Sequence, residues 1–396
     1  MNPHTRLGRF VIYALLVGLS LVFAMPFVWL VSTSLKPIDQ TMSLPLTFIP
    51  RAYYAEIDGQ QREVTLDFTV AQPGVVAEIS AGPEAGHRVF LSDDQLARRS
   101  ADVRVLHRVQ PGWWHVTVRI NSTRVVHPGE AADPGTAGPA PWDLVPRSSI
   151  DSHVRFRWRN YPEALATIGG DPGTPGSAAA LNHVSFWVFL ANSLTVCVLG
   201  VLGTVFSNSI VAYGFARLRW PGRDAFFAVT LATMMVPFPA LMVPLYGIFK
   251  MLHMVGTLQP LWLPTFFGSA FNIFLMRQFF LTIPEELSEA ARIDGCSEWR
   301  IFLRVILPLS KPVLVVAALF HFLFAWNDFL GPLLYLSRKQ TFTLSLALQS
   351  YESQTGGVQW HYLMAASAVT ILPVVVLFLF TQRFFVQGIA TTGTKG

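Results

Sequence analysis

The segment 282–308 combines residue types that suit docking to another protein. Glu289, Ala290 and Ala291 follow one another, and Asp294 and Gly295 come shortly after them. Small alanine side chains let a helix approach a groove closely, and the two carboxylates can pair with Arg or Lys of a partner. The chemistry expected here is charged contact rather than bond making. A second interpretation, an amphipathic helix lying on the lipid surface, stays open on the residues alone.

Two short helices joined at a glycine are expected to position these residues. Thr282 and Glu285 have the spacing of a capping box, which predicts the start of the first helix. Gly295 is placed to end that helix in a left-handed conformation. Ser297 can cap a second helix, which Pro308 is expected to end.

A second candidate site lies in apolar stretches that contain polar or helix-breaking residues. Asn327 and Asp328 follow Trp326, and such groups are costly inside a membrane unless they face a cavity or a partner. A hydroxylated molecule could hydrogen-bond to them, and a ring could stack on Trp326. Pro237, which interrupts another apolar stretch, and Tyr246 complete this predicted substrate path. A structural hydrogen bond between helices and a simple kink are the alternatives.

Motifs for bond-making chemistry are missing from the sequence. The ten histidines are scattered without metal-binding spacing. Neither a Gly-x-x-x-x-Gly-Lys-Ser/Thr phosphate loop nor a Gly-x-Ser-x-Gly elbow occurs. We therefore expect no catalytic residue, no metal site and no cofactor bound by this chain.

The composition indicates that most of the chain lies in a membrane. Hydrophobic residues make up 52% and charged residues only 13%, with a mean hydropathy of +0.43, whereas soluble proteins carry about 25% charged residues. An ordinary cytosolic enzyme, a disordered chain and a disulfide scaffold are excluded. Six apolar runs are long enough to span a bilayer: 10–33, 186–216, 225–249, 261–280, 312–335 and 362–385. The first is too long for a cleaved signal peptide, so we expect it to be retained.

The distribution of Lys and Arg predicts the orientation of these spans. With the amino terminus inside, cytoplasmic segments hold 12 basic residues and short outer segments hold 4. Positive charge favours the cytoplasmic side. Both termini are therefore expected in the cytoplasm.

The stretch 51–159 differs from the rest and is expected outside the cytoplasm. It holds 13 arginines and 13 acidic residues, so the remainder carries the whole net charge of +5. Period-two alternation predicts strands at 64–70, 75–79, 87–91, 103–109, 114–120 and 125–127, and a Gly/Ala/Pro-rich linker at 128–146. The prediction is an all-α polytopic membrane protein with six transmembrane helices and a small β-rich domain inserted after the first. Its parts are 1–50, 51–159 and 160–396.

The loop 282–308 resembles a family motif. Glu289-Ala290-Ala291, then Gly295, then Val305-x-Leu307-Pro308 is similar to the E-A-A…G…I-x-L-P coupling loop of ABC-importer permeases, with Val305 as the departure. Further similarities are Thr33-Ser-Leu-Lys-Pro37, Asn192-Ser193, Ala212-Tyr-Gly-Phe-Ala-Arg-Leu218, Pro221-Gly222, Val236-Pro237, Pro244-Leu-Tyr246, Trp326-Asn-Asp-Phe329 and Lys395-Gly396. Residues 8–50 and 160–396 together resemble the second permease of the carbohydrate-uptake, maltose-type branch. The insert 51–159 departs from that family.

The resemblance implies transport driven by a separate motor protein. In this family the coupling loop sits in a cleft of the ATPase subunit, and closure of the ATPase pair tilts the permease helices as rigid bodies. Glu289 would bear the charged contact and Gly295 would set the bend, so Gly295→Asp should uncouple transport from hydrolysis. The other implied coupling residues are Ala290, Ala291, Asp294, Leu307 and Pro308.

The resemblance also implies the partners and the location. The partners would be a second permease in a heterodimer, two ATP-binding subunits that carry ATP and Mg, an extracytoplasmic solute-binding protein and membrane lipid, without nucleic acid. The location would be a bacterial or archaeal cytoplasmic (inner) membrane.

Three functional hypotheses remain open from the sequence. The first is a permease subunit of an ATP-driven carbohydrate importer. The second is the same architecture importing glycerol phosphate or another polyol-like solute. An anionic cargo needs basic groups in the path, and the few candidates are Lys36, Lys250, Arg338 and Lys339, so a neutral sugar is favoured. The third is a membrane-anchored sensor or adhesion protein working through the β insert, which deletion of 55–150 would distinguish.

Overall fold

The computed structural model describes residues 6–41, 47–57, 60–70, 74–79, 88–92, 103–109, 113–118, 142–146, 150–170, 183–355 and 359–392. The chain forms two compact units. The first comprises Met1–Tyr161 with Val358–Ala365, and the second comprises Pro162–Gly357 with Ala366–Gly396.

The first unit begins with an apolar helix that packs against little of the chain. This helix, α1 (Arg6–Ser34), has an apolar stretch at Gly8–Ser34 of which no residue in the most hydrophobic window is buried. A helix that is hydrophobic all round is stable where lipid covers it. A short 3₁₀ turn, η1 (Ile38–Gln40), follows the helix.

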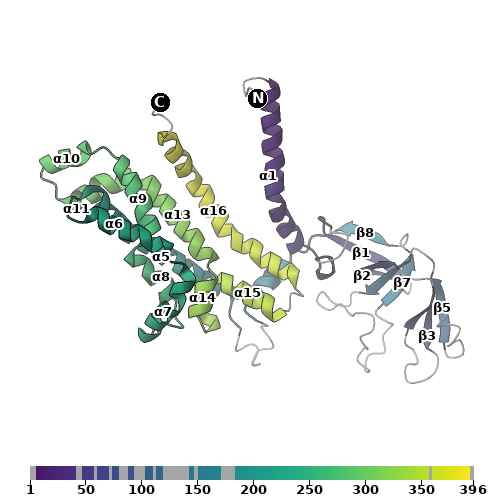
Figure 1. The fold of residues 1–396 in the computed structure, drawn as a ribbon. Helices are drawn as coiled ribbons and strands as arrows, with labels where there is room; N and C mark the ends of the chain where they lie inside the picture. Colours follow the sequence, from purple (N-terminus) through teal and green to yellow (C-terminus); the bar gives the residue numbers. More distant parts are fainter. Residues whose placement is uncertain are drawn as a thin grey trace. The chain divides into compact units, whose positions relative to one another are not determined.

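In the described part of the insert, eight strands form two antiparallel sheets (Figure 1). The larger sheet has the order β7-β6-β2-β1-β8 and the smaller has the order β4-β3-β5. The strands are β1 (Arg51–Ile57), β2 (Gln60–Val70), β3 (Gly74–Ile79), β4 (Arg88–Ser92), β5 (Val103–Val109), β6 (Trp113–Val118), β7 (Trp142–Pro146) and β8 (Asp151–Val154).

Three of these strands were not predicted from the sequence. β1 and β8 pair with each other, with Arg51 opposite Val154. β7 lies at the end of the stretch 128–146, where a linker was expected, and it pairs with β6 through Trp114 opposite Val145. Long-range pairing decides such short strands, and local composition does not reveal it. The strand predicted at 125–127 and the linker up to residue 141 lie outside the described residues.

The second unit is helical. The long helix α5 (Phe186–Arg217) packs against α9 (Ala270–Thr282) and α13 (Lys311–Asn327) (Figure 1). Other helices are α3 (Asn160–Thr167), α6 (Arg223–Ala232), η3 (Thr233–Met235), α7 (Phe238–Met251), α8 (Gln259–Trp262), η4 (Leu263–Phe267), α10 (Glu286–Ile293), α11 (Glu298–Ile301), η5 (Phe302–Ile306), α12 (Leu307–Leu309), α14 (Leu330–Tyr335), η6 (Lys339–Thr341), α15 (Leu344–Thr355) and α16 (Trp360–Thr392).

Small residues on α5 allow its neighbours to approach closely. A Cβ on Gly203 would lie 2.2 Å from Thr265 Oγ1, and a Cβ on Gly200 would lie 2.4 Å from His321 Nε2. Ser207 donates to the Thr265 carbonyl at 2.9 Å. Close packing of small residues is the usual way for helices to associate in lipid.

Three helices in the described part of the chain are long and apolar enough to span a membrane by themselves: Gly8–Ser34, Phe186–Arg217 and Trp360–Gln382. The number of spans reaches six only if each of three bent helix pairs counts as one span. The first pair, Arg223–Met235 with Phe238–Met251, is bent by 98°.

The interruption expected at Pro237 within the apolar run 225–249 is confirmed, because the chain bends there between η3 and α7. Val236 is extended (φ −76°, ψ 115°) because it precedes Pro237, whose ring disfavours a helical conformation for the residue before it. The predicted run 312–335 is likewise divided, at Asp328 between α13 and α14.

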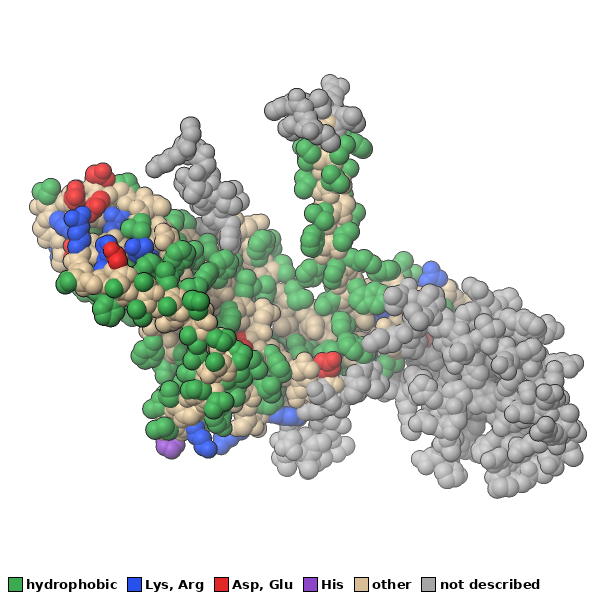
Figure 2. All heavy atoms as spheres, viewed as in Figure 1, with side chains coloured by type: hydrophobic (Ala, Val, Ile, Leu, Met, Phe, Trp, Pro, Cys, Tyr) green, Lys and Arg blue, Asp and Glu red, His purple; other side chains and the backbone are tan. Residues whose placement is uncertain are grey.

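Charged side chains gather at the end of the helical unit that carries α10 and α11, and hydrophobic side chains cover most of the visible surface below it (Figure 2). The segment 282–308 thus lies at a charged end of the bundle.

Candidate functional site

Gly295 bends the chain between α10 and α11. Its φ is +74°, in the left-handed region that glycine adopts freely. The Cys296 N–H donates to the Ala291 carbonyl at 2.9 Å, and the Gly295 N–H donates to the Arg292 carbonyl at 3.0 Å. These are the two bonds of a Schellman motif. The prediction of a left-handed bend at Gly295 is confirmed.

The predicted capping box at the start of this segment is wrong. Thr282 is the last residue of α9, and its hydroxyl donates to the Phe279 carbonyl at 2.7 Å. Ile283 is extended (φ −74°, ψ 131°), as favoured before Pro284. The proline thus separates two helices, and α10 begins after it without a side-chain cap.

The helix after the bend is longer than predicted. Ser297 precedes α11, but its side chain makes no capping hydrogen bond. The chain continues as the π-helical segment η5 and then as α12. Pro308 lies in the first turn of α12 rather than ending the helix, a position where no N–H is needed.

One carboxylate ties the bend to the long helix α5. Arg292 Nε donates to Glu298 Oε1 at 2.9 Å, and the Tyr213 hydroxyl donates to Glu298 Oε2. The hydrogen bond from Arg292 lowers the pKa of the Glu298 carboxyl, and the bond from Tyr213 acts in the same direction. Tyr213 also packs on Phe302, with ring centroids 5.1 Å apart. These contacts join α10, α11 and α5.

An apolar core lies beneath the bend. It draws on the ends of α5, α9 and α13 and on the helix after the bend. Its buried members are Ala212, Tyr213, Ala216, Met276, Phe280, Ile283, Ile301, Phe302, Ile306, Val313 and Ala317. The predicted residues Ala291 and Leu307 pack against this core. The bend is therefore packed through this core against α5, α9 and α13.

The outer face of the bend carries exposed carboxylates, and Ile293 is the most exposed of its large apolar side chains. Glu289, Ala290 and Asp294 are exposed, as is Pro308. Ile293 is 87% exposed. Sequence analysis missed Ile293, although an isoleucine directly before Asp294 and Gly295 at a helix end is a usable signal.

Two arginines, whose contacts the sequence does not predict, hold the helix ends beside the bend. Arg217, at the end of α5, donates to the carbonyls of Phe280 and Ile283 at the end of α9. Arg277 of α9 donates from Nε to the Phe215 carbonyl at 3.3 Å. Each guanidinium satisfies backbone acceptors that a helix end leaves open. The two helices are thus fixed to each other at this end.

Three residues predicted to line the substrate path make contacts within the protein. Trp326 is buried and stacks on Phe322 with centroids 5.4 Å apart. Asn327 donates to the Leu323 carbonyl of its own helix at 2.8 Å. Asp328 Oδ1 accepts from the Gly331 N–H at 3.0 Å, so this carboxylate caps α14.

Pro237 and Tyr246 lie on the broken part of the bundle. Pro237 precedes α7 at the 98° bend and is exposed. Tyr246 stacks on Tyr335, with centroids 6.5 Å apart, and Phe249 meets the same ring edge-on. The aromatic contact therefore joins α7 to α14.

Within the described residues, no group of three or more His, Cys, Asp or Glu side chains could hold a metal ion. His321 of α13 belongs to no such group. Its Nε2 has no hydrogen-bond partner and faces Gly200 within the bundle. The imidazole acts as a packing group between α13 and α5.

Comparisons with known proteins agree with a transport role for this fold. Residues 203–391 match the family model described as binding-protein-dependent transport system inner membrane component. The arabinooligosaccharides transport system permease protein AraQ of Halalkalibacterium halodurans is 37% identical over 211 residues, which cover 53% of this chain and 75% of that protein. The sn-glycerol-3-phosphate transport system permease protein UgpE of Pectobacterium atrosepticum is 34% identical over 251 residues, which cover 63% and 83%.

A solved bacterial ABC transporter involved in the import of the acidic polysaccharide alginate is also similar. It shares 24% sequence identity and a TM-score of 0.49, over 61% of this chain and 82% of that one.

Proposed function

Because the chain belongs to the family of binding-protein-dependent transport system inner membrane components, we propose that it is a permease subunit of an ATP-driven ABC importer for a carbohydrate. It forms the translocation path with a second permease and is moved by separate ATP-binding subunits. Family membership favours this role over the sensor or adhesion alternative, which does not require the helical bundle of the second unit.

The observation that carries the proposal is the bend at Gly295 with its tie to α5. The exposed residues Glu289, Asp294 and Ile293 offer carboxylates and an apolar tip to a partner. Force applied there passes through Arg292 and Glu298 to Tyr213. Rigid tilting of the helices then alternates access to the path.

The proposed assembly supplies the chemistry that this chain lacks. Two ATP-binding subunits hold ATP and Mg, and a solute-binding protein delivers the cargo from outside. Six spans place both termini in the cytoplasm and the insert outside it. In this arrangement 51–159 offers a contact surface to the binding protein or to the second permease. Deletion of 55–150 tests that role, because uptake should be lost while the complex still assembles.

The proposed cargo is a neutral oligosaccharide or sugar. The relative AraQ is named for arabinooligosaccharides. The predicted path residues Trp326, Asn327 and Tyr246 combine aromatic rings and an amide, which suit stacking and hydroxyl recognition. Pro237 and Asp328 lie at breaks in the helices that line this path.

A second cargo class is favoured by the relative UgpE, which is named for sn-glycerol-3-phosphate. An anionic cargo would need basic side chains in the path. Lys250 and Arg338 are exposed at helix ends, as is expected of loops at a membrane surface. Competition of sugar uptake by arabinooligosaccharide and by glycerol phosphate separates the two classes.

The function is tested by substituting Gly295 in the full assembly. Valine is strongly disfavoured at φ +74°, whereas asparagine tolerates the left-handed region. Aspartate tolerates it too, so Gly295→Asp, expected from the sequence to uncouple transport, does not test the backbone bend. A Cβ at this position has no atom within 4 Å, so a steric clash does not confuse the result. Gly295→Val should insert and assemble but lose sugar uptake per ATP hydrolysed, and Gly295→Asn should retain most of it. Native uptake in Gly295→Val would contradict the proposed lever.

A further inference from the structure

Large apolar side chains are exposed where the insert meets the end of α1. They precede β1 or lie at and after the end of β8, and we call them the apolar base: Phe48, Ile49, Val154, Phe156 and Trp158. Each is between 43% and 67% exposed. Apolar side chains gathered in this way mark a surface that another apolar phase covers.

The apolar base is fixed to the last turns of α1. The ring of Phe48 meets Trp29 of α1 edge-on, with centroids 5.4 Å apart. The carbonyl of Phe48 accepts a hydrogen bond from the Ser32 hydroxyl. On the other segment, the Arg157 N–H donates to the Leu35 carbonyl at 3.0 Å. The base therefore lies at the level where α1 ends.

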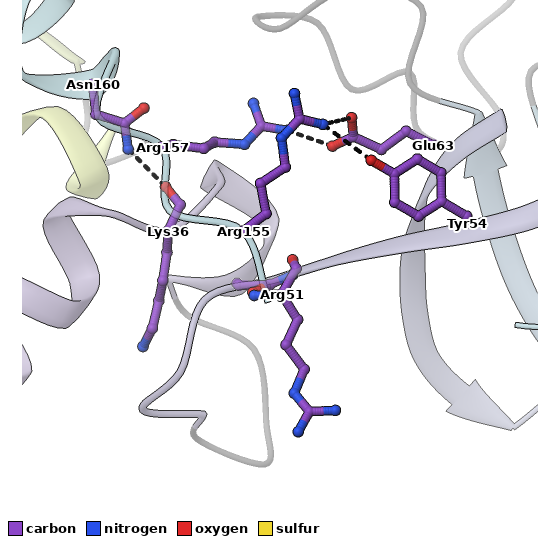
Figure 3. A network of polar contacts seen from close by, with 8 residues as sticks. Lys36, Arg51, Tyr54, Glu63, Arg155, Arg157 and Asn160 are labelled. Atoms are coloured by element: carbon purple, nitrogen blue, oxygen red, sulfur yellow. Dashed lines mark hydrogen bonds and ion pairs between the residues drawn. The ribbon is translucent and has the colours of Figure 1, made fainter. Parts of the chain in front are cut away.

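Further contacts make this junction rigid. The side chain of buried Asn160 donates to the carbonyls of Ser34 and Lys36, at 2.8 Å each (Figure 3). The Lys36 ammonium lies over Trp29, 4.0 Å from the ring centroid. Tyr161, whose ring stacks on Trp158, shares a hydrogen bond of 2.9 Å with Ser34. The apolar base cannot move away from α1 without breaking these bonds.

The arginines between the apolar residues face the sheet. Arg155 and Arg157 both reach Glu63 of β2, Arg155 at 3.0 Å (Figure 3). Alternate side chains of an extended segment point to opposite sides. Phe156, between the two arginines, therefore points away from Glu63. The two arginines therefore face the insert, and the opposite side of the segment 154–158 is apolar.

We propose that the apolar base lies in the interfacial layer of the outer leaflet, with lipid as its occupant. The Gly8–Ser34 helix is about 40 Å long at 1.5 Å per residue, whereas the hydrocarbon core is about 30 Å thick. Its last turns therefore lie among the headgroups, where tryptophan is enriched. The exposed surface of α1 continues directly onto Phe48 through Trp29. Lipid that covers α1 thus also covers the base, which holds the insert against the membrane surface.

This inference rests on the proposed spanning of the membrane by α1, and spin labelling in the full complex tests both separately. The two native cysteines, Cys197 and Cys296, are replaced by alanine and serine. Single labels are then introduced by Phe156→Cys, Leu16→Cys and Arg104→Cys in complexes reconstituted into phosphatidylethanolamine–phosphatidylglycerol nanodiscs. Collision with oxygen reports lipid, and collision with a water-soluble nickel chelate reports water. Leu16 is the control for α1, and exposed Arg104 of β5 is the control for water.

The label at Phe156 should collide with oxygen more often than with the nickel chelate, as the label at Leu16 does and unlike the label at Arg104. Nickel accessibility equal to that at Arg104 would place the base in water and overturn the inference. Low accessibility to both reagents would mean that a protein partner covers it, which also overturns the inference. A label at Leu16 that is accessible to nickel would instead overturn the proposed spanning of α1.

Discussion

Arg292 and Glu298 form a hydrogen-bonded ion pair across the Gly295 bend, with 2.9 Å between Nε and Oε1. The pair joins the last turn of α10 to the first turn of α11. Because Glu298 also accepts a hydrogen bond from Tyr213, one side chain connects the bend with the long helix α5. Side-chain contacts therefore link the bend to the buried core beneath it.

Loss of this pair should reduce coupling more than stability. An ion pair of this exposure contributes about 0.2–1 kcal/mol, so Arg292→Gln should change the thermal midpoint little. Sugar uptake per ATP hydrolysed should fall several-fold, because α10 can then pivot on Gly295. Arg300→Gln, at an exposed position of α11, is the matched control. Equal uptake ratios in both variants would show that the pair transmits no force.

Acid should remove the contribution of Glu298. Its folded-state pKa is lowered, so its stabilising contribution is complete above the unfolded value of about 4.3. The contribution is lost as pH falls through the lower folded value. The difference in thermal midpoint between the native chain and Glu298→Gln should therefore be constant near neutrality and shrink below about pH 4. A difference that grows in acid would mean that the carboxylate is not held by Arg292.

Alanine substitutions at two glycines of α5 should change the free energy of unfolding in opposite directions. A Cβ on Gly203 would lie 2.2 Å from Thr265 Oγ1 and 2.6 Å from Phe266, whereas a Cβ on Gly214 has no atom within 4 Å. Gly203→Ala should cost about 1–3 kcal/mol through overpacking. Gly214→Ala should stabilise the helix by about 0.5–1 kcal/mol. Thermal unfolding in detergent measures both, and destabilisation of equal size would contradict the close approach at Gly203.

The capping contact at α14 distinguishes a structural from a substrate role for Asp328. A Cβ on Gly331 would lie 2.4 Å from Asp328 Oδ2. Gly331→Ala and Asp328→Ala should each cost about 1 kcal/mol, the usual value of a lost cap. Asp328→Asn keeps an acceptor oxygen and should preserve both stability and uptake. Native stability with strongly reduced uptake in Asp328→Asn would assign the carboxylate to the cargo instead.

Sequence reasoning succeeded where the signal is local. The bend at Gly295 follows from a glycine after a helical pattern, and α1 follows from an unbroken apolar run. It failed at Thr282, because Pro284 favours an extended Ile283 and so separates two helices. The tie between Tyr213 and Glu298 joins residues 85 positions apart, which no pattern in one sequence reveals.

The missed strands have the same cause, whereas the capping role of Asp328 depends on a contact only three residues away. β1 and β8 are adjacent in space but about a hundred residues apart in the chain. Asp328 was singled out as an ionisable group in an apolar run, and only its contact with Gly331 distinguishes a cap from a ligand. Pattern indicates which residues are unusual, and three-dimensional contacts decide what they do.

In the proposed function, a separate ATP-hydrolysing subunit binds the bend at Gly295. Photo-crosslinking from position 293 can detect that subunit, because Ile293 is 87% exposed at the tip. With Ile293→p-benzoylphenylalanine in the assembled complex, we expect a crosslink to an ATP-binding subunit that changes in yield when nucleotide is added. A crosslink only to lipid, or none in an assembly that still imports sugar, would contradict it.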